Sequence, residues 1–202
     1  MKPTLIIFLK APVAGKVKTR LAREMGDIAA LEIYQRLVRR QMAALPEGWP
    51  VEIHFAPADA ESVMRDWLGE QPNWSFWPQV ESGLGERLAY ATTESFRRGA
   101  PAVMLIGGDC PELGEAEFLA GAQYLAESNV VIGPTKDGGY YLLGMDSPRL
   151  ALFENVAWST ATVADRTREI IREQGWTSAE LLQLRDVDTL EDWEALRDHA
   201  SN

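Results

Sequence analysis

The sequence of 202 residues contains little cysteine and little histidine, the side chains on which many enzymes rely. A single cysteine, Cys110, excludes an internal disulfide and a zinc site built from several cysteines. Two histidines, His54 and His199, argue against a histidine-bound zinc enzyme or a Ser-His-Asp hydrolase. Any catalysis should therefore rest on carboxylates, cations and a hard metal ion. We expect Cys110 to be a packed residue and not a nucleophile, because no histidine is tied to it.

Long apolar runs are also missing. No window reaches the roughly 18 apolar residues that a membrane-spanning helix needs, so we expect no membrane span. The run LIIFL after Lys2 is too short for a signal peptide and is closed by Lys10. A formal net charge of -10 disfavours non-specific binding to nucleic acid, because phosphate contacts need cations. Together these features predict a soluble, cytoplasmic protein that binds no nucleic acid.

Short apolar runs alternate with amphipathic stretches along the whole chain. We expect strands at residues 5–9, 51–56, 74–77, 102–106, 130–133, 140–143 and 181–184. We expect helices at residues 19–45, 59–68 with Asp59 as the cap, 84–98, 115–128, 162–174 and 190–199. This alternation predicts an α/β fold, with a mostly parallel central sheet and helices on both faces. There is no repeat or linker, so residues 1–202 should form one domain.

The loop KAPVAGKVKTR follows the first expected strand and is strongly basic in an otherwise acidic chain. Ligands of parallel sheets bind outside the carboxyl ends of the strands. Gly15, the helix expected from Thr19 and the charges of Lys18 and Arg20 would suit an anion such as phosphate. The alternative is a solvated basic turn. The loop lacks the spacing of a P-loop, which excludes that kind of site.

A second loop, GGDCPEL, follows the expected central strand AVMLI. Asp109 lies there beside Gly107 and Gly108, which leave room next to the backbone. A carboxylate at a strand end is well placed to hold Mg²⁺ or Mn²⁺, which bind through one or two carboxylates and substrate phosphates. The alternative is that Asp109 caps the turn before Pro111.

Five segments together resemble one family. The segments FLKAPVAGKVKTRLA, ESGLGERL, IGGDCPEL, GPTKDGGYYLLG and DVDTLEDW cover nearly the whole chain, from about Leu5 to Trp193. They resemble small bacterial GT-A-like glycosyltransferases associated with radical-SAM/selenodomain or arsenosugar gene clusters, formerly a domain of unknown function. The resemblance implies a single GT-A-like, nucleotide-diphosphosugar transferase sandwich over residues 1–202. Its wider relatives include molybdenum-cofactor and phospholactate guanylyltransferases.

The resemblance also implies site residues in the first two loops. The turn under the nucleotide base corresponds to Leu9, Lys10, Ala11 and Pro12, and the part facing the phosphates to Gly15, Lys18 and Arg20. The metal-binding aspartate corresponds to Asp109. GT-A enzymes often show Asp-x-Asp here, but this chain has Pro111 two residues later, which leaves the metal site one carboxylate short.

The resemblance offers a second carboxylate near the end of the chain. In DVDTLEDW, either Asp186 or Asp188 could complete the metal site. Alternatively, Asp188 caps the last helix, with Glu191 as its capping-box partner. In ESGLGERL, Gly83 and Arg87 would lie near the nucleotide, or would only begin a helix.

The remaining candidates lie on the acceptor side. Asp137 could hold a sugar hydroxyl or act as a base, and Gly138 and Gly139 would allow a ligand to approach closely. The same Asp-Gly pair is a common hairpin signal, so a plain turn is the alternative. Trp158 and Ser159 would line the acceptor pocket, although a tryptophan more often serves packing.

Three functions remain open at this point. The first is a metal-assisted glycosyltransferase, using Mg²⁺ or Mn²⁺, that moves a sugar from a nucleotide-diphosphosugar to a small-molecule acceptor. The second is a guanylyltransferase-like nucleotidyltransferase that uses a nucleoside triphosphate and releases pyrophosphate. The third is a non-catalytic nucleotide-binding protein. The family resemblance favours the first.

Overall fold

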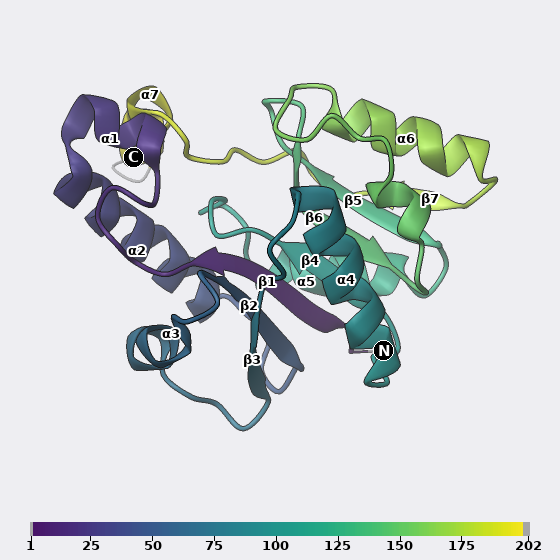
Figure 1. Cartoon of the computed structure of the whole chain (residues 1–202). Helices are drawn as coiled ribbons and strands as arrows, with labels where there is room; N and C mark the ends of the chain where they lie inside the picture. Colours follow the sequence, from purple (N-terminus) through teal and green to yellow (C-terminus); the bar gives the residue numbers. More distant parts are fainter. Residues whose placement is uncertain (1, 200–202) are drawn as a thin grey trace.

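A computed structural model describes residues 2–199 of the chain (Figure 1). Seven strands form one sheet in the order β3-β2-β1-β4-β6-β5-β7. Only β6 runs antiparallel to its neighbours, so the sheet is mostly parallel, as predicted. The strands are β1 (Thr4–Lys10), β2 (Val51–Ala56), β3 (Trp74–Pro78), β4 (Val103–Ile106), β5 (Val130–Pro134), β6 (Tyr140–Met145) and β7 (Ser178–Glu180).

Helices cover both faces of this sheet, which confirms the predicted α/β architecture. The α-helices are α1 (Thr19–Met25), α2 (Asp27–Ala43), α3 (Glu61–Leu68), α4 (Leu84–Arg97), α5 (Glu115–Tyr124), α6 (Val163–Glu173) and α7 (Leu190–His199). A short 3-10 helix, η1, spans Leu150–Phe153. Within the described residues, no helix is both long and apolar enough to span a bilayer.

The alternation of side chains along β1 explains the two covered faces. Leu5, Ile7 and Leu9 join a core that contains residues of α2, α3 and α5, whereas Ile6 joins the opposite core under α4 and α6. Successive side chains of a strand point to opposite faces, so a strand buried on both sides is apolar throughout. A third, smaller core joins α1, α2 and α7. It brings α7 beside α1 and α2 (Figure 1).

Three predicted elements need correction. The single helix expected at residues 19–45 is two helices, because Gly26 with φ 84 breaks it between α1 and α2. Asp59 does not cap α3, which follows Ala60 and begins at Glu61. The last strand is Ser178–Glu180 and not 181–184, where Leu184 forms only an isolated bridge with Thr135. This edge strand is short and partly exposed, so it carries no apolar run to reveal it.

The core makes a prediction about two adjacent residues of α5. Phe118 is fully buried, whereas Leu119 is 51% exposed. We expect Phe118→Ala to lower the free energy of unfolding by about 3–5 kcal/mol, because it removes a buried ring and leaves a cavity. Leu119→Ala should change it by less than about 0.5 kcal/mol. Urea unfolding followed by circular dichroism measures both, and equal losses would contradict the assignment of the α5 faces.

Candidate functional site

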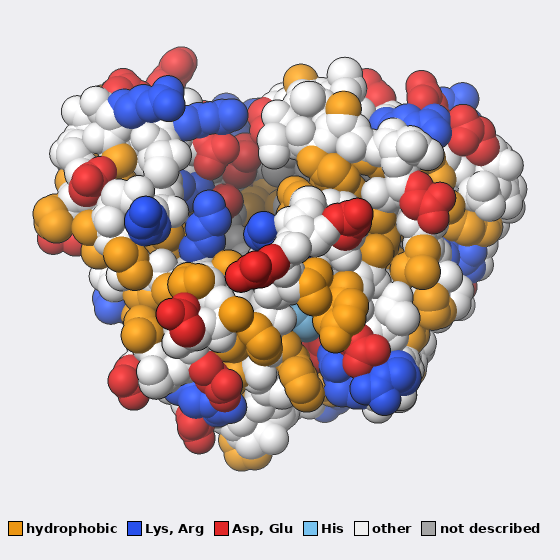
Figure 2. Space-filling view, in the orientation of Figure 1, with side chains coloured by type: hydrophobic (Ala, Val, Ile, Leu, Met, Phe, Trp, Pro, Cys, Tyr) orange, Lys and Arg blue, Asp and Glu red, His pale blue; other side chains and the backbone are white. Residues whose placement is uncertain are grey.

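A cleft of about 550 Å³ lies where β1 and β4 end, on the side of the sheet at which the chain order reverses. Ligands of open α/β sheets bind at such a switch point. Figure 2 shows the hollow between the lobe of α1 and α7 and the lobe of α6, with acidic and basic side chains on its walls. The lining comes from β1, α1, α4, β4 and the loop after it, the β5–β6 hairpin with the start of β6, and the segments at 158–163 and 186–188.

Lys18 joins three parts of the chain at one end of this cleft. Its ammonium nitrogen lies 2.5 Å from Oδ1 of Asp109 and 2.9 Å from Oδ1 of Asp188, and it donates to the carbonyl of Val187 at 2.6 Å. The side chain is only 5% exposed. Burial opposes the charged form of Lys18, but the two carboxylates outweigh it and raise the pKa of Lys18 above its ordinary value.

This arrangement corrects the role predicted for Lys18. An ammonium group has three N–H donors, and here they meet three acceptors of the protein itself. Lys18 therefore has no free donor for a phosphate and instead holds Asp109 and Asp188 together. Arg20 is different, because its side chain is 66% exposed and lines the cleft, with Nη1 3.6 Å from Oδ2 of Asp188. It remains available to bind an anion.

Asp188 does not cap α7, so the capping alternative is wrong. The capping box consists of Thr189 and Asp192, since Asp192 Oδ2 accepts from the backbone N–H groups of Asp188 and Thr189 and from the Thr189 hydroxyl. The hydroxyl of Thr189 in turn accepts from the N–H of Asp192. Because the carboxylate of Asp188 is not used to cap the helix, it contacts Lys18 and lines the cleft.

Asp109 is positioned by its backbone as well as by Lys18. Its carbonyl accepts from the N–H of Val187, which ties the loop after β4 to the C-terminal segment. Gln41, buried on α2, donates to the carbonyl of Gly107 at 2.5 Å. A Cβ at Gly108 would lie 2.7 Å from Cδ2 of Leu9, so glycine lets the loop pass close to β1 without displacing that side chain. The carboxylate of Asp109 is 48% exposed and lines the cleft.

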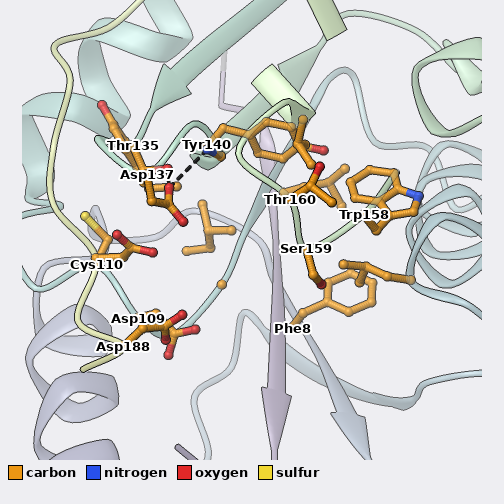
Figure 3. Close-up of a pocket in the computed structure, with 18 of the residues that line it drawn as sticks. Phe8, Asp109, Cys110, Thr135, Asp137, Tyr140, Trp158, Ser159, Thr160 and Asp188 are labelled. Atoms are coloured by element: carbon orange, nitrogen blue, oxygen red, sulfur yellow. Dashed lines mark hydrogen bonds between the residues drawn. The ribbon is translucent and has the colours of Figure 1, made fainter. Parts of the chain in front are cut away.

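The β5–β6 hairpin brings Asp137 to the same end of the cleft (Figure 3). Its Oδ1 accepts from the hydroxyl of Thr135 at 2.5 Å and from the N–H of Gly139 at 3.0 Å. The hairpin turn is therefore confirmed, and it fixes a carboxylate that lines the cleft. A role of Asp137 toward an acceptor stays a prediction. Gly139 lines the cleft too, whereas Gly138, with φ 91, packs against the backbone of Ala161 and is required by the turn.

Asp186 is a fourth carboxylate that lines the cleft. The sequence analysis proposed it only as an alternative to Asp188. Burial, and then the negative charge of Asp137, raise the pKa of Asp186 to about 6. The alternation of DVD along an extended segment was a signal for it, since Asp186 and Asp188 lie on the same side of the chain with Val187 buried between them.

The turn expected under a nucleotide base lies outside the lining of the cleft. Leu9, Lys10, Ala11 and Pro12 do not line it. Tyr34 donates to the carbonyl of Lys10 and accepts from its N–H, and the N–H of Ala11 is bound to Ala56. These backbone groups hold the end of β1 in place. Gly15 is needed for its φ of 74 and for its closeness to Asp27.

The glycines of ESGLGERL also have structural roles. The N–H of Gly83 donates to the carboxylate of Glu86 at the start of α4. Arg87 donates to the carbonyl of Ser82 and to Gln79, so it braces the loop before α4. Neither Gly83 nor Arg87 lines the cleft. Gly85, to which the sequence analysis gave no ligand role, makes room for Trp158.

The opposite end of the cleft is aromatic and apolar. Trp158 and Ser159 both line it, and their expected role in an acceptor pocket stays a prediction. Phe8, Tyr140 and Leu88 line it too and were missed. Each lies in a strand or helix, where an apolar side chain is ordinarily read as core. Cys110 is buried, which raises the pKa of its thiol to about 12 and confirms that it is a packed residue.

The carboxylates fit a hard divalent cation. Asp109 and Asp188 meet at one nitrogen of Lys18, so their carboxylates are neighbours, and carboxylate oxygens are the ligands that Mg²⁺ and Mn²⁺ prefer. Over residues 2–199 no three acidic, histidine or cysteine side chains converge as a complete ligand set. The other ligands would be water and substrate phosphates, as is usual for Mg²⁺.

Comparisons with known proteins agree with this architecture. A family profile with the description "Uncharacterized protein conserved in bacteria (DUF2064)" matches residues 39–160. A candidate nucleotide-diphospho-sugar transferase from Desulfovibrio desulfuricans G20 is 32% identical, with a TM-score of 0.91 over 100% of this chain and 89% of that chain. No curated protein sequence matches.

Two more distant structures share the fold. A nucleotidyl transferase from Methanothermobacter is 13% identical, with a TM-score of 0.64 over 100% of both chains. Rv0371c from Mycobacterium tuberculosis H37Rv, solved as a complex with manganese, is 14% identical, with a TM-score of 0.52 over 97% of this chain and 98% of that chain. These likenesses confirm the predicted nucleotide-diphosphosugar transferase-like fold. The association with radical-SAM/selenodomain or arsenosugar gene clusters stays a prediction.

The contacts of Lys18 generate a test of the acidic end of the cleft, the end lined by Asp109, Asp137, Asp186 and Asp188. We expect Lys18→Met to lower the free energy of unfolding by about 2 kcal/mol in metal-free buffer, because it leaves Asp109 and Asp188 facing each other without a cation. The exposure of both carboxylates keeps the loss below that of a fully buried pair. The control is Arg20→Met, which should cost less than about 0.5 kcal/mol. Urea unfolding measures both, and a larger loss for Arg20→Met would refute the role given to Lys18.

Proposed function

The chain belongs to the DUF2064 family, and we propose that it is a glycosyltransferase that moves a sugar from a nucleotide-diphosphosugar to a small-molecule acceptor. One observation carries the proposal. Lys18 draws Asp109 and Asp188 together at the switch point of the sheet, in a chain that matches a candidate nucleotide-diphospho-sugar transferase along its whole length. We further propose that residues 1–202 act as one nucleotide-binding domain and that the protein works in the cytoplasm.

The acidic end of the cleft is where we place the diphosphate of the donor. Asp109, Asp137, Asp186 and Asp188 line one cleft, and such a concentration of negative charge would repel a diphosphate by itself. A divalent cation held by Asp109 and Asp188 would neutralise the charge that develops on the leaving diphosphate. Arg20, exposed at the same end, would bind phosphate oxygens directly.

Asp137 is the residue that we assign to the acceptor hydroxyl. Thr135 and Gly139 hold one of its oxygens, which orients the carboxylate at the cleft wall. In the transfer, a bond forms between the acceptor oxygen and the anomeric carbon while the bond from that carbon to the phosphate oxygen breaks. The nucleoside diphosphate leaves, and the hydroxyl proton passes to Asp137.

Nucleotidyl transfer is the competing reaction, since the fold is shared with a nucleotidyl transferase. It would use the same cation and the same acidic end, with a phosphorus atom in place of the anomeric carbon as the centre attacked. The two reactions differ in their products, because sugar transfer releases a nucleoside diphosphate and nucleotidyl transfer releases pyrophosphate.

Thermal unfolding tests the nucleotide site. UDP, GDP, CDP, ADP and their triphosphates would each be added with and without Mn²⁺ to the wild type and to Asp109→Ala. A ligand at about 100 times its dissociation constant stabilises the native state by about 2.7 kcal/mol, which raises Tm by about 5–10 °C in a chain of this size. We expect such a rise with at least one base, dependent on Mn²⁺ and lost in Asp109→Ala.

The matched control is Asp165→Ala, which removes an exposed carboxylate of α6 outside the cleft. It should keep the full nucleotide-dependent rise in Tm. No rise with any nucleotide in the wild type would overturn the proposed function, and a rise that survives Asp109→Ala would overturn the assignment of the acidic end.

A further inference from the structure

Five side chains form what we term the aromatic end of the cleft, namely Phe8, Leu84, Leu88, Tyr140 and Trp158. Figure 3 shows Phe8, Tyr140 and Trp158 on the side of the cleft opposite Asp109, Asp137 and Asp188. The cleft is therefore divided by chemistry, with charge at one end and rings at the other. A transferase needs places for two substrates, and the two ends differ in what they can bind.

Phe8 presents a fixed ring to the cleft. Its other side stacks on His54, with ring centroids 5.4 Å apart and an interplanar angle of 14°. His54 is itself buried and bound to Glu52, which Arg98 holds at 2.7 Å. The ring is thus supported from behind, so a ligand that packs on it would order little that is not already ordered.

Trp158 is fixed on three sides. Its indole stacks on Phe153 at 6.5 Å and meets the ring of Tyr140 edge-on at 6.4 Å. Its Nε1 lies against α4, where a side chain at Gly85 would come within 2.5 Å of it. The glycine in the first turn of α4 therefore admits the indole and sets its orientation. This wall of the cleft is preorganised before any ligand arrives.

The aromatic end offers few polar groups to a ligand. The hydroxyl of Tyr140 is buried without a hydrogen-bond partner, and Nε1 of Trp158 faces α4. Thr160 is bound to the carbonyl of Ala157, whereas Ser159 lines the cleft with a backbone φ of 63. A nucleobase would bury several donors and acceptors here without partners, at a cost of about 1–3 kcal/mol each. A planar apolar molecule with one hydroxyl group would avoid this cost.

We infer that the aromatic end binds the acceptor of the proposed transferase, and that this acceptor is a planar, largely apolar molecule carrying a hydroxyl group. The inference rests on the proposed function, which assigns the acidic end to the donor. Ring faces and the leucines of α4 take the plane, and the hydroxyl points toward Asp137 at the acidic end. Sugars and polyols, which lack a large apolar face, fit this end less well.

The probe for this inference is 4-methylumbelliferone, a fluorescent planar molecule with one hydroxyl, titrated into the full chain and followed by fluorescence polarisation. We expect binding by the wild type that is about tenfold weaker in Trp158→Ala, which equals about 1.4 kcal/mol. Leu84→Ala is the second variant, because Leu84 is 41% exposed and its loss leaves the core intact. It should weaken binding by about threefold.

The control is Leu119→Ala, which removes an exposed leucine of α5 outside the cleft and should bind the probe like the wild type. Neither uridine nor glucose should displace the probe at matched concentration. Failure of the wild type to bind the probe, unchanged binding in both cleft variants, or displacement by uridine would each overturn the inference.

The nucleotide-dependent rise in Tm distinguishes a failure of the acceptor inference from a failure of the proposed function. A rise in Tm without probe binding would overturn the acceptor class and leave the donor site standing. Probe binding without any nucleotide effect would overturn the proposed function, and with it the interpretation of the aromatic end as an acceptor site.

Discussion

The ion pairs of Lys18 with Asp109 and Asp188 are the constraint on which the site depends. They join the loop after β1, the loop after β4 and the segment before α7, three parts of the chain that are far apart in sequence. Each carboxylate alone would be a surface group, but around one buried ammonium they become a defined acidic centre. The lysine stabilises this pair of like charges and keeps the two carboxylates side by side, which is the arrangement that the proposed cation would need.

The sheet and helices around this centre carry polar side chains that hold the loops in place. Tyr34 and Gln41, both buried on α2, fix the ends of β1 and β4 through backbone atoms of Lys10 and Gly107. On the other face, Gly85 lets Trp158 pack against α4. Buried polar groups in a core are costly unless they are bonded, so these contacts define a single arrangement of the loops that line the cleft.

The sequence predicted the layers, the central position of β4 and the loops that matter, because buried parallel strands are continuous apolar runs that end at breakers. It failed where a residue's role depends on distant partners. Lys18 was expected to face phosphate, and only the fold shows that Asp109 and Asp188 occupy its donors. Phe8 was missed because it lies in an apolar strand, and the local sequence does not reveal which ring of a core faces a cleft. The packing role of Gly85 was missed because it lies in a motif whose resemblance indicated a nucleotide site.

The most direct test of this account is a crystal structure of the protein with Mn²⁺ and the nucleoside diphosphate that stabilises it best. The account predicts Mn²⁺ on the carboxylates of Asp109 and Asp188, with the diphosphate beside it, the ammonium of Lys18 still on its protein acceptors, and the rings of Phe8 and Trp158 uncovered by the nucleotide. A nucleotide bound away from Asp109, a base stacked on Trp158, or Lys18 moved onto the phosphates would contradict it.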